Sequence, residues 1–319
     1  MNRVVALAGG VGGAKLADGL ARCLPPGGLT MLVNTADDCT LHGLHVSPDL
    51  DTVLYTLAGL ANPDTGWGLA GDTFATLEML ARYGAPDTWF RIGDRDFATH
   101  IERTRRLRAG EPLSAVTAAL AAALGVQTTL LPMTDAPVAT VVETDAGTLD
   151  FQTYFVERGH RDAVRALRFA GAEDAQPPAA LTDALAGAGA VVFCPSNPLV
   201  SIGPILAVPG TRAAIAAAPG PRVAVSPIVG GRALRGPADQ MLTTLGHESS
   251  ALGVARLYAG LIDGMVIDTA DAALAPAIAA LGMRVAVVPT VMRDTADRRT
   301  LAEAVLTFCG TLRHEGVPC

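Results

Sequence analysis

The chain has 319 residues, of which 50% are hydrophobic and 17% are charged, and its formal net charge is −7 at pH 7. This length can form one large or two medium domains with a substantial core. The acidic balance argues against a nucleic-acid-binding surface, and no uninterrupted apolar run of about 18 residues predicts a membrane span. The first residues lack the basic region and cleavage site of a signal peptide, so we expect a cytoplasmic protein.

The cysteines indicate reduced thiols. Their number, 5, is odd, and no pair has the C-x-x-C spacing of a zinc or redox site. Cys39 lies in a polar segment that we expect to be a loop. It is the one candidate for a reactive thiol, although no His or other base is fixed beside it in the sequence. The five are Cys23, Cys39, Cys194, Cys309 and Cys319.

The N-terminal segment predicts a strand, a glycine loop and a helix. Residues 3–8 are apolar, residues 9–15 read GGVGGAK, and leucine and alanine then recur at helical spacing. Such a loop presents backbone N–H groups and a helix N-terminus to a phosphate. It is neither a P-loop nor a complete G-x-G-x-x-G, so a tight turn without ligand stays open. The phosphate-binding candidates are Gly10, Gly12, Gly13 and Lys15, the one lysine of the chain.

The following residues predict a strand over 29–33, a polar loop over 34–38 and a helix that begins at Ser47-Pro48. Between residues 60 and 125 we find no strand pattern. Three helices are expected there, over 72–83, 94–109 and 112–124. We interpret residues 59–127 as a helical insertion over the active site, and residues 1–58 and 128–319 as the core.

The second half predicts alternating strands and helices. Residues 138–144 and 148–155 flank Asp145-Ala146-Gly147, which is typical of a hairpin. Residues 156–175 are ambiguous, and Arg158, Arg161 and Arg165 within them fit a surface or a site. Further strands are expected over 190–194, 222–225, 264–267 and 285–288, and a helix is expected to open near Pro237. The chain is therefore predicted to be α/β, a Rossmann-like three-layer sandwich with a mostly parallel sheet and a helical insertion.

Polar loops follow four of the predicted strands, at residues 9–15, 34–38, 195–201 and 226–231. In a parallel sheet with right-handed crossovers, these loops gather at one edge. We predict the functional site at that edge.

Four carboxylates fall within fifteen residues near this edge, at Asp37, Asp38, Asp49 and Asp51. Hard oxygen ligands beside a phosphate loop suit Mg²⁺, which would neutralise a diphosphate. The alternative is helix capping and turn formation, which we favour for Asp49 alone. In the loop after residue 194, the polar candidates for a phosphate or nucleobase, with a turn and an N-cap as the alternative, are Ser196, Asn197 and Ser201.

Residues 89–96 contain a dense mix of aromatic and charged side chains. Arg91, beside Trp89 and Phe90, is a candidate to stack on or bond to a flat ring, and the alternative is an ion pair with Asp94 or Asp96. Arg95 and Arg235 are weaker anion-binding candidates. The histidines show no metal-binding spacing. His100 is interpreted as structural, whereas His42 and His45 are candidates for substrate contact.

Several segments together resemble the 2-phospho-L-lactate transferase family of coenzyme F-420 biosynthesis, whose archaeal members are called CofD and whose actinobacterial members are called FbiA. The resemblance runs through most of the chain in the expected order. The segments are GGVGGAK (9–15), NTADD (34–38), SPDLDTVLY (47–55), GWG (66–68), GDRDFATH (93–100), FQTYF (151–155), SNPLVSIGPIL (196–206) and SPIVGG (226–231).

The resemblance implies a reaction in which a guanosine-diphosphate-activated three-carbon acid is transferred to the deazaflavin FO and GMP is released. It implies Mg²⁺ as cofactor and a homodimer. Asp37 and Asp51 match the family's acidic positions, which implies metal and hydroxyl contacts. The implied FO-binding residues are Asp51, Arg91 and Trp89; the implied guanosine diphosphate contacts are the glycine loop with Lys15 and the loop of Ser196, Asn197 and Ser201. The acid on the donor is left open among lactate, enolpyruvate and glycerate types.

Close relatives often have Thr at position 11 or Arg at position 15, so the resemblance implies a charge at Lys15 and no strict requirement for lysine. One rival is a regulatory protein of the gluconeogenesis-factor (YvcK) branch, which binds nucleotide sugars without catalysis. The PDLDT segment at 48–52 favours the transferase over that branch. A nicotinamide-dependent oxidoreductase is the weaker rival, because an intact fingerprint with its acidic residue is missing.

Overall fold

The computed structural model describes residues 2–315, and its centre is a seven-stranded sheet in which neighbouring strands are parallel. The strands lie in the order β5-β2-β1-β9-β10-β13-β14. Their bounds are β1 Val4–Ala8, β2 Leu29–Val33, β5 Thr129–Pro132, β9 Ala190–Phe193, β10 Arg222–Val225, β13 Gly264–Ile267 and β14 Arg284–Val287.

The direction of winding reverses between β1 and β9, the two central strands. From β1 the chain proceeds through β2 to β5 on one side, and from β9 through β10 and β13 to β14 on the other. This is the doubly wound Rossmann arrangement, which leaves a crevice at the carboxyl ends of the two strands where the order reverses. The predicted Rossmann-like α/β fold is confirmed.

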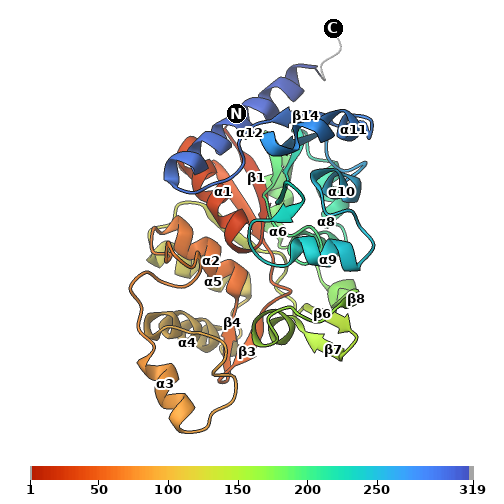
Figure 1. Ribbon diagram of the computed structural model, residues 1–319. Helices are drawn as coiled ribbons and strands as arrows, with labels where there is room; N and C mark the ends of the chain where they lie inside the picture. Colours follow the sequence, from red (N-terminus) through yellow and green to blue (C-terminus); the bar gives the residue numbers. More distant parts are fainter. Residues whose placement is uncertain (1, 316–319) are drawn as a thin grey trace.

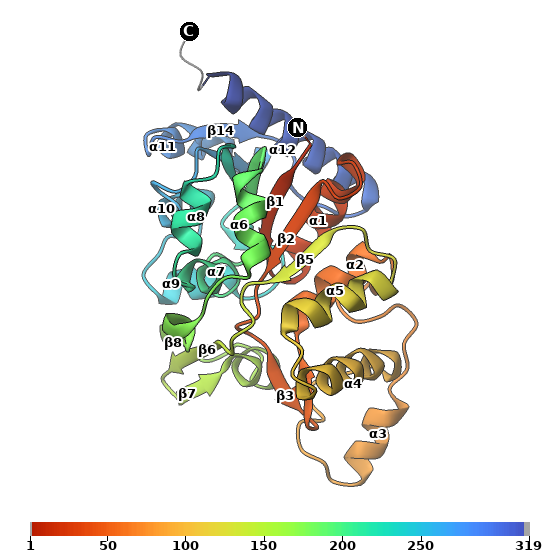
Figure 2. The same cartoon turned by 180° about the vertical axis from the view of Figure 1, so that it is seen from behind.

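Helices cover both faces of the sheet, because alternate residues of each buried strand point to opposite cores. On one face, Val4 and Ala6 pack with α1 Gly10–Cys23, α2 Pro48–Leu57, α5 Leu113–Ala123 and α12 Thr295–Glu315. On the other face, Val5 and Leu7 pack with α6 Ala179–Ala186, α7 Ile202–Ala207, α8 Thr211–Ala216, α9 Ala238–Thr244, α10 Ala251–Leu257 and α11 Ala275–Ala279. Figures 1 and 2 show these layers from opposite sides.

The predicted insertion contains the three expected helices, α3 Ala75–Arg82, α4 Asp94–Arg108 and α5. Helices α3 and α4 cap each other reciprocally. The Asp72 carboxylate accepts hydrogen bonds from backbone N–H groups in the first turn of α4, and Asp94 accepts them from the first turn of α3. Asp72 therefore precedes α3 and serves α4 as a capping residue. Figure 1 shows α3 and α4 at the end of the molecule opposite α12.

Residues 39–46 form a hairpin, β3 Cys39–Leu41 with β4 Leu44–Val46, where we expected a loop. Its turn residues His42 and Gly43 both have positive φ, 51° and 75°. That conformation matches the twist of a two-residue hairpin. The sequence did not predict this hairpin because histidine is uncommon at the first, positive-φ position of such a turn, although glycine is typical at the second.

A second small sheet has the order β7-β6-β8, with β6 Ala139–Thr144, β7 Gly147–Asp150 and β8 Val164–Ala170. The predicted hairpin is confirmed, but its second strand ends at Asp150. Residues 153–157 form a π-helix instead, which buries Tyr154 beside Val142. Strand β8 lies in the stretch that was ambiguous, and β5 was not predicted. In that stretch, Arg158 and Arg165 form local ion pairs with Asp162 and Asp145.

Helices α1 and α12 pack closely at Gly19, whereas Gly310 of α12 faces open space. A Cβ on Gly19 would lie 2.2 Å from the carbonyl oxygen of Arg298, whereas a Cβ on Gly310 of α12 would meet nothing within 4 Å. We expect Gly19→Ala to lower the free energy of unfolding by about 1–3 kcal/mol through overpacking. Gly310→Ala should raise it by about 0.5–1 kcal/mol, because alanine favours the helix. Urea unfolding of both variants measures this, and equal effects would contradict the packing.

Candidate functional site

The turn from β1 into α1 lies against the loop that follows β9. The Ser196 hydroxyl accepts a hydrogen bond from the Gly9 backbone N–H (3.0 Å) and donates one to the Gly9 carbonyl (2.8 Å). A Cβ on Gly12 would lie 2.3 Å from the Pro195 carbonyl oxygen, and one on Gly13 would lie 2.6 Å from Ser196 Oγ. The close approach of the loop after β9 therefore accounts for these glycines.

The predicted glycine loop is shorter than expected, because α1 already begins at Gly10. The Gly10 backbone N–H donates to Asp49 Oδ1 at 2.7 Å. A carboxylate of the chain itself thus occupies the positive end of the helix, which is a favourable position for an anion. Asp49 was interpreted as a cap of its own helix α2; the structure places its carboxylate at the start of α1.

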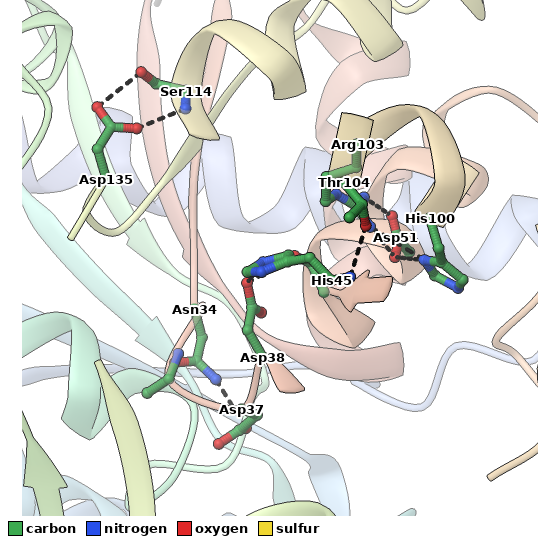
Figure 3. Close-up of polar contacts among 12 residues, drawn as sticks. Asn34, Asp37, Asp38, His45, Asp51, His100, Arg103, Thr104, Ser114 and Asp135 are labelled. Carbon is green, nitrogen blue, oxygen red and sulfur yellow. Dashed lines mark hydrogen bonds and ion pairs between the residues drawn. The ribbon is translucent and has the colours of Figure 1, made fainter. Parts of the chain in front are cut away.

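The side chain of Asn34 connects the segments at this edge, and the sequence alone did not single it out. Its amide nitrogen lies 2.9 Å from Asp37 Oδ2, 3.0 Å from Asp49 Oδ2 and 3.3 Å from the Val200 carbonyl oxygen. Its Oδ1 accepts from the Ala36 N–H. Figure 3 shows Asn34 and Asp37 pointing toward each other. The end of β2, the start of α2 and the loop after β9 therefore meet at one amide.

In the part of the chain that the structure describes, no ion pair reaches Asp37 or Asp49, whereas Asp38 has His45 beside it. Burial raises the pKa of Asp37 well above its ordinary value, and the neighbouring Asp49 charge adds to this effect, opposed by the side chains of Thr140 and Asn34. Burial also raises the pKa of Asp38, and it raises that of Asp49 to about 6. Among the described residues, Oδ1 of Asp37 and Oδ1 of Asp38 are buried without a hydrogen-bond partner. Such a set is suited to a cation.

Asp38 is held from the hairpin β3–β4. His45 Nε2 lies 3.0 Å from Asp38 Oδ2, and the Ser47 hydroxyl donates to the same oxygen at 2.7 Å. The second oxygen of Asp38, Oδ1, is buried and has no hydrogen-bond partner among the described residues. Burial raises the pKa of the adjacent Cys39 thiol to about 12. That shift leaves Cys39 protonated at neutral pH and argues against a nucleophilic role.

Asp51 lies in a different environment from Asp37. Both of its oxygens accept hydrogen bonds from the buried guanidinium of Arg103 on α4, one at 3.0 Å and one at shorter range. His100 Nδ1 lies 3.7 Å from the same carboxylate. Figure 3 shows Asp51 grouped with Arg103 and His100. The structure therefore does not bring Asp51 and Asp37 into a shared contact, and the metal role of Asp51 stays a prediction.

The candidates for nucleotide binding make contacts within the chain. Lys15 Nζ donates to the Met292 carbonyl at 2.7 Å, and burial, followed by the charges of Arg298 and Arg235, lowers its pKa. Asn197 Oδ1 accepts from the Leu199 N–H at 2.9 Å, as in an Asx turn. The Ser201 side chain is buried and lies against Gly9. The turn-forming alternative is thus present, and the nucleotide contacts stay predictions.

Arg91 and Trp89 lie on the connection between α3 and α4. The Arg91 guanidinium stacks over the Phe74 ring at 4.1 Å, and the Trp89 ring packs edge-on against Phe90 at 5.9 Å. The alternative for Arg91, an ion pair with Asp94 or Asp96, is absent among the ion pairs of the described residues. No contact of the described residues joins Arg91 or Trp89 to Asp37 or Asn34, so the FO-binding role of both stays a prediction.

Within residues 2–315 no group of three or more His, Cys, Asp or Glu side chains forms a complete metal cage, and no helix is long and apolar enough to cross a membrane. Magnesium commonly uses one or two carboxylates together with substrate phosphates, so a partial set suits it. Two cavities of about 240 and 490 Å³ lie at the opposite, amino edge of the sheet, lined by residues such as Leu29 and Arg3. Cys319 lies outside the described residues.

Comparison with known proteins decides the family. The family model described as "2-phospho-L-lactate transferase CofD" matches residues 4–294. The chain belongs to this transferase family. A relative in Streptomyces griseus subsp. griseus named "Phosphoenolpyruvate transferase" is 47% identical over 316 residues, which covers 98% of this chain and 99% of the relative. Relatives with the same name in Streptomyces coelicolor and Thermobifida fusca are 46% and 44% identical over 98% of this chain and 99% of theirs.

A solved structure has a similar fold. A protein of the UPF0052 family from Bacillus halodurans superposes with a TM-score of 0.65 and 15% identity, over 96% of this chain and 98% of that one. Identity this low shows the fold alone. The family resemblance expected from the motifs is therefore confirmed by the family model and the sequence relatives, and the Rossmann-like architecture by both the sheet and this neighbour.

The buried pair between α2 and α4 predicts a stability effect. Removing Arg103 would leave the Asp51 carboxylate buried without its partner, which typically costs about 3–5 kcal/mol. We expect Arg103→Ala to lower the free energy of unfolding by that amount in urea titrations. The control is Arg105→Ala on the same helix, whose ion pair with Glu102 is exposed and should change stability little. Equal losses for both variants would contradict a buried pair.

The raised pKa of Asp49 predicts a pH effect. Between about pH 4 and 6 the folded protein keeps a proton that the unfolded chain has released, so unfolding free energy falls as the pH rises through this window. Relative to Asp49→Asn, wild type should lose roughly 1–3 kcal/mol between pH 4 and 7. Urea unfolding in EDTA at several pH values measures this, with the exposed Asp183→Asn as control. Parallel profiles for wild type and Asp49→Asn would exclude the shift.

Proposed function

We propose that the chain transfers a phosphoenolpyruvyl group from a guanosine-diphosphate-activated donor to the deazaflavin FO, releasing GMP in the biosynthesis of coenzyme F-420. The family assignment supports the transferase chemistry. The name shared by relatives 46–47% identical supports enolpyruvate as the three-carbon acid. The GWG, GDRDFATH and SNPLVSIGPIL segments support the same reaction through the family resemblance.

The observation that carries the proposal is the pair of unpartnered carboxylate oxygens, Asp37 Oδ1 and Asp38 Oδ1, at the carboxyl end of β2. Both are buried, and Asp49 lies beside Asp37 with a raised pKa. The donor set therefore fits Mg²⁺, and Asp37, with Asp38 next to it, would hold the ion. A bound Mg²⁺ would neutralise the diphosphate and stabilise the charge that develops during transfer.

The transfer breaks one phosphorus–oxygen bond and forms one. The terminal ribityl hydroxyl oxygen of FO attacks the phosphorus that carries the enolpyruvyl group. The bond from that phosphorus to the GMP oxygen breaks, and GMP leaves with the electron pair. Asp49, whose pKa lies near 6, accepts the hydroxyl proton, since a general base works best with a pKa near the working pH. No covalent enzyme intermediate is required.

Other residues of the edge would bind and orient the substrates. Lys15 lies near two further cations, Arg298 and Arg235. Burial is the main cause of its lowered pKa, and repulsion from the charges of these two arginines lowers it further. A diphosphate would relieve that repulsion. Asn34 would keep Asp37 and Asp49 in place through its amide. For Asp51 we propose an anchoring role through Arg103 in place of direct metal ligation. The homodimer stays a prediction.

Activity tests this proposal through Asp37. Because Asp37→Asn keeps the shape and removes the charge, we expect kcat to fall about 10²–10³-fold, the loss typical of one preorganised electrostatic group. Half-maximal activity should also require a higher Mg²⁺ concentration. GMP release is followed by chromatography with FO, the enolpyruvyl donor and Mg²⁺, and Asp183→Asn on the surface of α6 should match wild type.

A purified wild-type protein that releases no GMP from any of the three donor types, yet binds a UDP-sugar tightly, would replace this proposal by the regulatory one. Mass spectrometry of the product from each donor identifies the acid. A phospholactyl product formed in preference to the enolpyruvyl one would correct the choice of donor while keeping the transferase.

A further inference from the structure

Residues 61–69 form a closed loop whose tip carries an exposed tryptophan. A β-bridge joins Ala61 to Leu69 at its base, and the Asn62 N–H donates to the Gly68 carbonyl at 3.0 Å. Trp67 stands between Gly66 and Gly68, whose φ angles are +78° and +69°. Such angles are readily adopted by glycine. The two glycines therefore fix a sharp turn around a single large side chain.

The tip of this loop is fastened to the functional edge at two points. A Cβ on Gly66 would lie 2.6 Å from Val11 Cγ1, in the first turn of α1. The Arg235 guanidinium donates to the backbone carbonyls of Asp64 (3.1 Å) and Thr65. Arg235 lies between β12 (Arg232–Ala233) and α9, in the second half of the chain. The tip is thus held between the glycine turn and a loop from the far side of the sheet.

The side chain of Trp67 is left uncovered by this arrangement. It is 41% exposed, and Leu234, next to Arg235, is 56% exposed. Within residues 2–315 the Trp67 ring stacks on no other aromatic ring, whereas Trp89 packs against Phe90. An exposed indole beside a polar edge offers an aromatic surface of the kind that lines ligand-binding sites.

We propose that Trp67, positioned by Arg235, forms one wall of a subsite for a flat heteroaromatic ring of a substrate. The inference rests on the proposed function, in which two such rings are present, the guanine of the donor and the deazaflavin of FO. Indole offers a large flat face for either ring. Trp67 directly follows Gly66, which contacts Val11 in the first turn of α1. Its indole therefore lies beside the predicted nucleotide-binding turn. This assigns the aromatic contact to Trp67 in place of Trp89.

Fluorescence tests the contact directly, because the chain has 2 tryptophans. Trp89→Phe leaves Trp67 as the sole emitter, and Trp67→Phe leaves Trp89. GDP and FO are titrated separately into each variant. We expect saturable quenching of Trp67 by one of the two ligands, which identifies the ring, and no saturable quenching of Trp89 by that ligand. Saturable quenching of Trp89 with an unchanged Trp67 signal would overturn the assignment.

Kinetics separates positioning from chemistry. Trp67→Ala should raise KM for the substrate whose ring is covered by about 5- to 100-fold, the range of one aromatic–base stack, with kcat changed less. Trp67→Phe should restore most of the loss, and Arg235→Gln should raise the same KM although the indole is kept. Tyr83→Ala, which removes a 76% exposed aromatic residue at the end of α3, is the control and should match wild type.

The outcomes for the subsite and for the reaction are distinct. If wild type releases GMP but Trp67→Ala keeps wild-type KM values for both substrates, the subsite is wrong and the proposed function stands. If wild type shows no turnover while GDP quenches Trp67 saturably, the subsite stands and the proposed function is wrong.

Discussion

The two hydrogen bonds between the Ser196 hydroxyl and the backbone of Gly9 set the spacing of the whole functional edge. They join the carboxyl ends of β1 and β9, the strands between which the sheet order reverses. The approach is so close that a Cβ on Gly9 would lie 2.5 Å from Asp49 Oδ2 and 2.6 Å from Ser201 Cβ. Glycine is therefore required here for packing within the protein, before any ligand is considered.

The buried carboxylates of this structure differ in whether a cationic side chain lies beside them. The Asp51 carboxylate forms a hydrogen-bonded ion pair with the Arg103 guanidinium, and this pair between α2 and α4 carries no net charge. Asp37 and Asp49 share one neutral amide, that of Asn34, and their pKa values are raised. Uncompensated buried charge is destabilising, so its persistence marks a functional site more strongly than a satisfied pair does. One acidic residue of α2 thus has a buried ion-pair partner, and in the proposed function another serves the chemistry.

The sequence predicts the buried parallel strands well, because short apolar runs such as residues 190–193 stand between glycine- or proline-rich turns. It also predicts the edge at which the loops gather, since parallel strands direct their carboxyl ends to one side. It does not predict that Asp51 turns toward Arg103, because the partner lies 52 residues further along the chain. Nor does it predict β8, which lies in the ambiguous stretch whose residues Arg158, Arg161 and Arg165 were interpreted as surface or site residues.

The two tryptophans illustrate why closeness in sequence is a weak guide to a binding site. Trp89 and Arg91 are near neighbours in the chain, which suggested a joint contact with a flat ring, but each already has an aromatic partner, Phe90 and Phe74. Trp67 has polar and glycine neighbours and offered no such cluster. Its position depends on Arg235, which lies about half the chain away and bonds the carbonyls just before it. A ring that is fastened beside the functional edge and left uncovered is better placed to bind a ligand than one whose face is already occupied.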